Sequence, residues 1–126
     1  MRYDPDRAPD PELWLALDES ERIDAVDAYH RRVEERVPDH LLHAAFHTIV
    51  ETQLAMAMPA VTDALVRLRA DGLSRHDAVH AIGSVLAAEM FELMQPDAPP
   101  DVDVNARYEA ALRELTAASW LASGDE

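Results

Sequence analysis

The sequence predicts an all-α protein: a four-helix-type bundle with a short N-terminal helix or arm. Three observations lead to this prediction. Apolar residues recur at spacings of three and four along most of the chain. Proline, glycine and acid-rich breaks divide the chain into segments of helical length. No stretch alternates apolar and polar residues as a half-buried strand would, and no glycine-rich phosphate loop is present.

The length and composition favour one folded domain. A chain of 126 residues can bury a substantial core, and 48% of its residues are hydrophobic. We divide it into an arm (residues 1–17), a helical bundle (18–120) and a tail (121–126). The absence of cysteine excludes disulfides, thiolate metal sites and a cysteine nucleophile.

The net charge of the chain limits the classes of partner that it can bind. A formal net charge of −14 disfavours nucleic acids and anionic membranes, because both require a positive surface. There is no apolar run of membrane-spanning length and no signal-peptide core, so we expect a cytoplasmic protein. All 11 basic residues are arginine, which indicates a GC-rich bacterial genome. Either codon bias alone or a halophilic source would explain this usage.

The first segments form an arm and a helix. Residues 1–11 are rich in proline and charge and predict irregular structure, and residues 11–17 predict a short helix whose Trp14 docks the arm. Asp18 and Glu21 match a capping box, which opens a helix that we expect to reach about Val37. His30 shares the apolar seam of this helix, and we interpret it as a packed, half-exposed residue.

The second main helix begins at Asp39, a good N-cap after the helix-breaking Pro38, and should end near Met58 because Pro59 follows. Its apolar side is predicted to consist of Leu42, Phe46, Ile49, Val50 and Leu54. A polar row formed by His43, His47 and Glu51 flanks that side, and we therefore expect this row to lie at the edge of the core.

The third helix begins at Pro59 and ends at Asp71-Gly72, with Gly72 as a left-handed cap. Ser74 and Asp77 match a second capping box, so a fourth helix should run from here to about residue 95. Its predicted apolar stripe contains Val79, Ile82, Leu86, Met90 and Leu93.

Gly83 lies one turn after His80 in the fourth helix, where it either permits a close helix crossing or leaves room for a ligand. Residues 96–101 form a proline-rich loop. A last helix is predicted from Asp103 to about Trp120.

Two histidine rows are the candidate functional feature. His43, His47 and Glu51 repeat at intervals of four in the second helix, and His76 and His80 do so in the fourth. Residues four apart lie on one face of a helix. Two His-x-x-x-His pairs are present where random placement of six histidines would give about a third of one.

These rows predict a metal site. Imidazoles with a carboxylate suit Zn, Fe, Ni or Mn, and helical bundles build metal centres from such side chains. We expect His43 and His47 to face His76 and His80, with Glu51 as a fifth ligand or hydrogen-bonded to one. The zinc-protease and di-iron signatures are absent, and no catalytic set can be assigned.

A second interpretation makes the histidines structural, each hydrogen-bonded to a carbonyl, a hydroxyl or a carboxylate. The protein would then be a non-enzymatic interaction module, with its apolar seams and Trp14 and Trp120 favouring a homodimer.

The segments Leu42-His43-x-x-x-His47-x-x-x-Glu51-x-Gln53 and Arg75-His76-x-Ala78-x-His80-Ala81-Ile82-Gly83 resemble a group of small bacterial helical proteins that share a domain of unknown function. The resemblance spans roughly residues 40–89. It implies a helical fold and a histidine-bearing core, and it implies no activity.

Overall fold

The computed structural model describes residues 1–33 and 39–123, and within them it contains α-helices and no strand. The predicted all-α fold is therefore confirmed. The seven helices of the described residues are α1 (Pro11–Ala16), α2 (Glu19–Arg32), α3 (His40–Ala55), α4 (Pro59–Ala70), α5 (Arg75–Leu93), α6 (Val104–Glu114) and α7 (Ala117–Ser123).

Local capping chemistry fixes most helix starts. The Asp18–Glu21 capping box opens α2 with both reciprocal bonds formed, and the Asp39 side chain accepts from the Leu42 N–H at the start of α3. Ser74 caps α5 by accepting from the Asp77 N–H. Each cap satisfies a backbone donor that the first turn leaves unpaired. The predicted continuation of α2 to Val37 lies outside the described residues.

The end of α3 comes earlier than predicted. The helix stops at Ala55, and Ala57 adopts a left-handed conformation with φ of 55°. The Ala57 and Met58 N–H groups then bond back to the Leu54 and Gln53 carbonyls, which closes the helix. Gly72, with φ of 103°, makes the corresponding turn after α4, as predicted.

The predicted last helix is two helices. The backbone of Leu115 is extended (φ −69°, ψ 129°), which ends α6. Thr116 and Ser119 then bond each other's backbone N–H through their side-chain oxygens, so a reciprocal cap opens α7. The prediction of one continuous helix to Trp120 was wrong because this local Thr-x-x-Ser signal competes with helix propagation.

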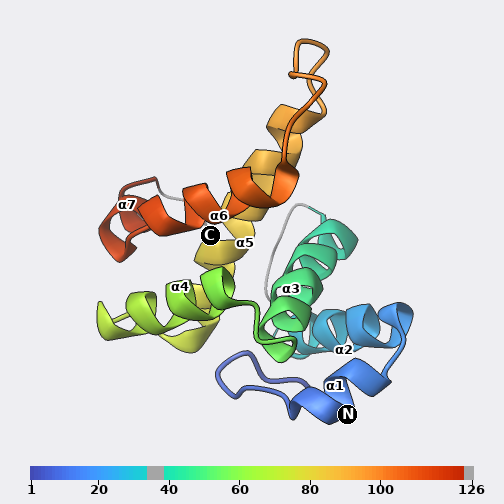
Figure 1. The fold of residues 1–126 in the computed structure, drawn as a ribbon. Coiled ribbons are helices and arrows are strands. Elements are labelled where there is room, and N and C mark those ends of the chain that lie inside the picture. Colours follow the sequence, from blue (N-terminus) through green and yellow to red (C-terminus); the bar gives the residue numbers. More distant parts are fainter. Residues whose placement is uncertain (34–38, 124–126) are drawn as a thin grey trace.

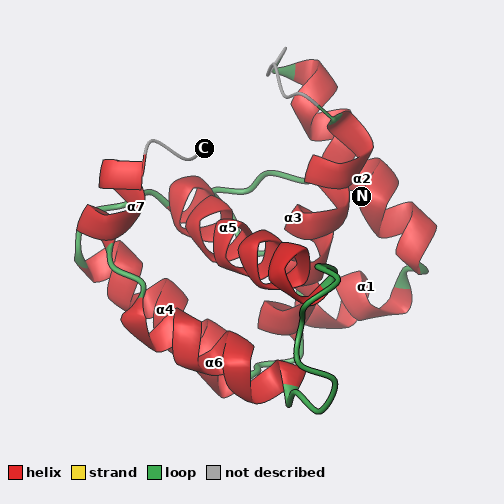
Figure 2. Cartoon of the chain, turned by 90° about the horizontal axis from the view of Figure 1, so that it is seen from above, coloured by secondary structure: helices red, strands yellow, loops and turns green. Residues whose placement is uncertain are grey.

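Helix α5 lies between two groups of elements. Figures 1 and 2 show α3 on one side of it and α4, α6 and α7 on the other, and α5 contacts all four. Residues 1–10, called the N-terminal arm from here on, pack with α1 and α2 around α3, while the C-terminal end of α5 projects beyond the body of the molecule. Within the described residues, no single helix is long and apolar enough to cross a membrane. Only α3 and α4 taken together have such length and composition, and they are bent by 103°.

The inward face of α3 differs from the predicted one. Leu42 is 53% exposed and Ile49 is 38% exposed, whereas His47 and Glu51 are almost fully buried. The polar row that was expected at the edge of the core therefore faces the interior, and the predicted apolar side is partly exposed. The hydrogen-bond partners that offset the cost of burying His47 and Glu51 come from other parts of the chain.

Candidate metal centre

Four histidines from three helices converge inside the molecule. They are His30 on α2, His43 and His47 on α3, and His80 on α5. Each offers a ring nitrogen, and these four nitrogens all lie within 4.8 Å of one another. His30 and His47 are buried, and the other two are partly buried.

His30 and His43 form a close pair in the cluster, with their Nε2 atoms 3.0 Å apart. His30 Nδ1 lies 2.9 Å from the Val26 carbonyl oxygen one turn earlier in α2, so it carries a proton and donates it. A neutral His30 then presents the lone pair of its Nε2 atom to the cluster. An ion about 2.1 Å from each nitrogen would hold tetrahedral neighbours about 3.4 Å apart, close to this separation.

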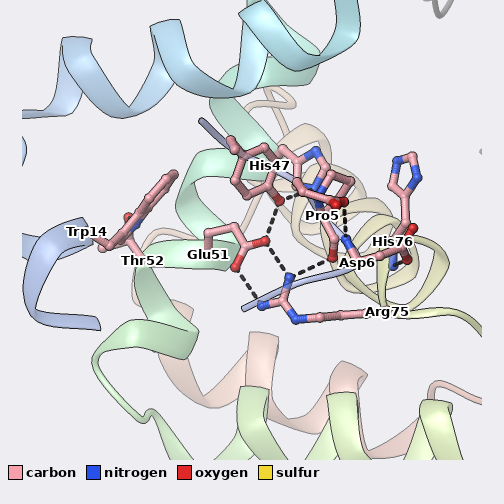
Figure 3. Close-up of polar contacts among 10 residues, drawn as sticks. Pro5, Asp6, Trp14, His47, Glu51, Thr52, Arg75 and His76 are labelled. Carbon is pink, nitrogen blue, oxygen red and sulfur yellow. Dashed lines mark hydrogen bonds and ion pairs between the residues drawn. The ribbon is translucent and has the colours of Figure 1, made fainter. Parts of the chain in front are cut away.

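His47 is held from outside the cluster by the N-terminal arm. Its Nε2 atom lies 3.0 Å from the Tyr3 hydroxyl, which donates its own proton to Glu51. Arg75 Nη1 and Nη2 each donate to a different oxygen of the Glu51 carboxylate at 2.8 Å. Figure 3 shows Glu51 between His47 and Arg75, with dashed lines to the guanidinium. The His47 Nδ1 atom is buried and has no hydrogen-bond partner.

His76 lies beside the cluster without joining the group of four. Its ring centroid is 4.4 Å from that of His80, and its ring stacks on His47 at 5.9 Å. The Nε2 atoms of His76 and His80 are both buried without a hydrogen-bond partner. His40, at the start of α3, is exposed and belongs to the surface.

The environment keeps the inner imidazoles neutral. Burial, reinforced by the neighbouring histidines, holds the pKa of His47 well below its usual value. The same causes, burial first and then His76, His43 and His30, lower the pKa of His80 to about 3. Burial beside the Glu51 carboxylate raises the pKa of the Tyr3 phenol, so the hydroxyl keeps its proton.

The structure brings together most of the histidines singled out in the sequence. His43, His47 and His80 are in the cluster, and His76 adjoins it. Glu51 is not one of the four: both of its oxygens accept from Arg75, and the Tyr3 hydroxyl lies between it and His47.

Three residues of the site were not predicted to belong to it: His30, Tyr3 and Arg75. His30 had a signal, since a histidine on the apolar seam of a helix must face either a partner or the core. It is buried, not half-exposed as expected. Tyr3 had no signal, because it lies in an irregular segment and is almost fully buried only through its tertiary contacts.

Comparison with protein-family models, with curated proteins and with solved structures finds no match to this chain. The resemblance to bacterial helical proteins noted in the sequence therefore stays a prediction, and the site has to be interpreted from its own geometry.

Proposed function

We propose that this protein binds a divalent transition metal through His30, His43, His47 and His80. The observation that supports this most directly is the convergence of four ring nitrogens, all within 4.8 Å of one another, in the interior. Helical bundles build metal centres from inward-facing side chains of this kind on neighbouring helices.

The protonation state supports the proposal. Metal ions bind neutral imidazole, so protons compete with them at histidine sites. The pKa of His47 is held well below its usual value and that of His80 is about 3, so both rings are neutral at physiological pH.

The hydrogen bonds on the outer side of the rings support it as well. Histidine ligands of metals almost always donate their second ring N–H to a carbonyl or a carboxylate, which fixes the tautomer. His30 donates to the Val26 carbonyl, and His47 is connected through Tyr3 to Glu51. In their neutral forms the two rings therefore keep one unprotonated nitrogen each, Nε2 on His30 and Nδ1 on His47.

The donor set indicates the class of metal. Imidazole suits Zn, Fe and Ni, whereas Mg and Ca prefer carboxylate and carbonyl oxygens. The chain has no cysteine, and the carboxylate nearest to His47 is occupied by Arg75. We therefore propose Zn, Fe, Ni or Mn, with Mn the least favoured because it also prefers oxygen ligands.

A purely structural role for the histidines fits the described residues less well. Hydrogen bonding alone would leave His47 Nδ1, His76 Nε2 and His80 Nε2 buried without partners. Each such group costs about 1–3 kcal/mol. Metal coordination would satisfy His47 Nδ1 and His80 Nε2.

The test is elemental analysis of protein purified without an affinity tag, which should contain about one first-row metal ion per chain. After chelation, adding Zn, Ni, Fe(II) or Mn should raise the melting temperature. His47→Ala or His80→Ala should abolish metal uptake, while His40→Ala, at an exposed position on the same helix as His47, should leave it intact. Wild-type protein that neither carries metal nor shifts its melting temperature with any of the four would refute the proposal.

A second proposal concerns the projecting end of α5, which carries exposed apolar side chains. Phe91 in α5 is 67% exposed, and Met94, directly after the helix, is 79% exposed. We propose that this end pairs two copies of the chain into a two-fold dimer. Light scattering should show a dimer that Phe91→Asp converts to a monomer. A wild-type monomer over a wide concentration range would exclude this.

A further inference from the structure

We infer that Tyr3 is a positioning residue for the proposed metal site: it determines which nitrogen of His47 is unprotonated and able to bind the metal, and it links docking of the N-terminal arm to metal binding. This inference rests on the proposed function and adds a means of regulating the same site.

The hydrogen-bond chain determines the His47 tautomer. Arg75 donates to both oxygens of Glu51, so this carboxylate is an acceptor toward every neighbour. The single hydroxyl proton of Tyr3 is donated to Glu51, which leaves the Tyr3 oxygen only as an acceptor toward His47 Nε2. His47 must therefore carry its proton on Nε2. Its Nδ1 lone pair is free, and this is the buried atom without a partner.

Three further bonds fasten the arm to the elements that carry the histidines. Arg32 of α2 donates to the Tyr3 carbonyl at 2.9 Å, and Arg75 of α5 donates to the Pro5 carbonyl at 2.8 Å. The His76 N–H, in the first turn of α5, donates to Asp6 Oδ1 at 3.1 Å. The dashed lines of Figure 3 join Arg75 to Pro5 and His76 to Asp6.

The Tyr3 ring is itself part of the packing. It is 2% exposed, and it meets the His47 ring edge-on at 5.5 Å and the Trp14 ring at 5.8 Å. Undocking of the arm would therefore remove both a hydrogen bond and a ring packing contact from His47. Since binding linkage is reciprocal, a metal that requires this His47 tautomer must in turn stabilise the docked arm.

The experiment compares Tyr3→Phe with Tyr108→Phe. Tyr108 is a matched control, because it is also buried and its hydroxyl donates to Gln53 at 2.7 Å, but it belongs to the other hydrophobic cluster. The first readout is the ring tautomer of His47 in metal-free protein, measured by long-range 1H–15N NMR. We expect the Nε2–H form in the wild type and in Tyr108→Phe, and a mixture or the Nδ1–H form in Tyr3→Phe.

The second readout is metal affinity by titration with Zn. Loss of an outer hydrogen bond to a ligand typically weakens metal binding about 10–100-fold, and we expect that loss in Tyr3→Phe alone. The third readout is limited proteolysis with trypsin. Mass spectrometry follows the rate of cleavage after Arg7, which is exposed. Zn should slow the release of residues 1–7 from the wild type and from Tyr108→Phe, but not from Tyr3→Phe.

The outcomes separate the two proposals. If the wild type takes up no metal, the proposed function fails, and the metal-free tautomer still decides the role of Tyr3. If the wild type binds Zn but Tyr3→Phe matches Tyr108→Phe in tautomer, affinity and protection, the inference on Tyr3 is overturned. An Nδ1–H tautomer of His47 in the wild type overturns it as well, even if Tyr3→Phe does not fold.

Discussion

The two sides of α5 face interiors of different chemistry. On one side, α4, α6 and α7 pack with α5 around a continuous apolar core that includes Leu68, Ile82 and Leu112. On the other, between the arm, α1, α2 and α3, the cluster of buried hydrophobic residues is smaller and contains, within the described residues, Tyr3, Trp14, Val26 and Ala44. All six buried polar or charged residues of the described chain lie on this second side or at the start of α5: Asp27, His30, His47, Thr48, Glu51 and Arg75. We call the two regions the apolar half and the histidine half.

The difference determines what each half depends on. Apolar burial is non-directional and needs no partner, so the core of the apolar half depends on packing more than on a complete set of polar partners. Buried polar groups cost free energy unless each one is bonded, so the histidine half depends on a complete set of partners. The histidine half should therefore respond to charge, pH and metal, and the apolar half to side-chain volume.

The largest effect should come from breaking the buried ion pair of the histidine half. Arg75→Met leaves the Glu51 carboxylate, whose side chain is fully buried, without its cation. Removing one partner of a buried pair destabilises proteins by about 3–5 kcal/mol. Urea denaturation should show this loss, with a much smaller one for Arg107→Met, because the Arg107 pair with Glu89 is partly exposed to solvent. Equal losses in the two variants would show that the histidine half does not depend on this pair.

The apolar half can be weakened without touching the site. Leu112 is fully buried in its core, so Leu112→Ala should destabilise the protein by about 2–5 kcal/mol through a lost contact surface and a cavity. The folded variant should still bind metal with wild-type affinity, as measured by titration well below its melting temperature. Weaker binding would mean that the two halves are coupled through α5.

The pH dependence of metal-free protein should reveal the histidine half. The pKa values of His47 and His80 are lowered in the folded state by burial and by the surrounding His30, His43 and His76. Below about pH 6.5 the unfolded chain binds protons at these rings while the folded chain does not. The free energy of unfolding should therefore fall as the pH decreases from 6.5 toward 3, by about 1.4 kcal/mol per pH unit for each neutral ring.

Carboxylates also titrate in this range, so the test is a difference between variants. His80→Asn should flatten the pH dependence of urea denaturation between pH 6.5 and 4, and His40→Asn, at the exposed position, should not. Identical profiles for the two variants would contradict a neutral, buried His80.

The smallest effect concerns Gly83, on the border between the halves. A β-carbon built there would lie 4.0 Å from Val50 Cγ2, which is an ordinary contact. Gly83→Ala should therefore stabilise α5 by up to about 1 kcal/mol, because alanine is the better helix former. A lower melting temperature would show instead that α3 and α5 need the closer approach.

The sequence by itself determined the local structure. The Asp18–Glu21 capping box, the Asp39 cap and the left-handed Gly72 are confirmed, because each depends on groups within a few residues of one another. The Thr116–Ser119 cap is equally local, but the prediction missed it and made one helix out of two. The spacing of histidines also identified three of the four clustered rings, because residues four apart share a helix face whatever the tertiary fold.

Only the tertiary structure decided which face of α3 is buried. Amphipathic patterns assign the inward side to apolar residues, because an isolated helix offers no partner to a buried carboxylate. Here Arg75 comes from α5 and Tyr3 from the arm, 24 and 48 residues away from Glu51 in sequence. These partners satisfy Glu51 and His47 in the interior, so the polar row of α3 faces inward while Leu42 and Ile49 are partly exposed.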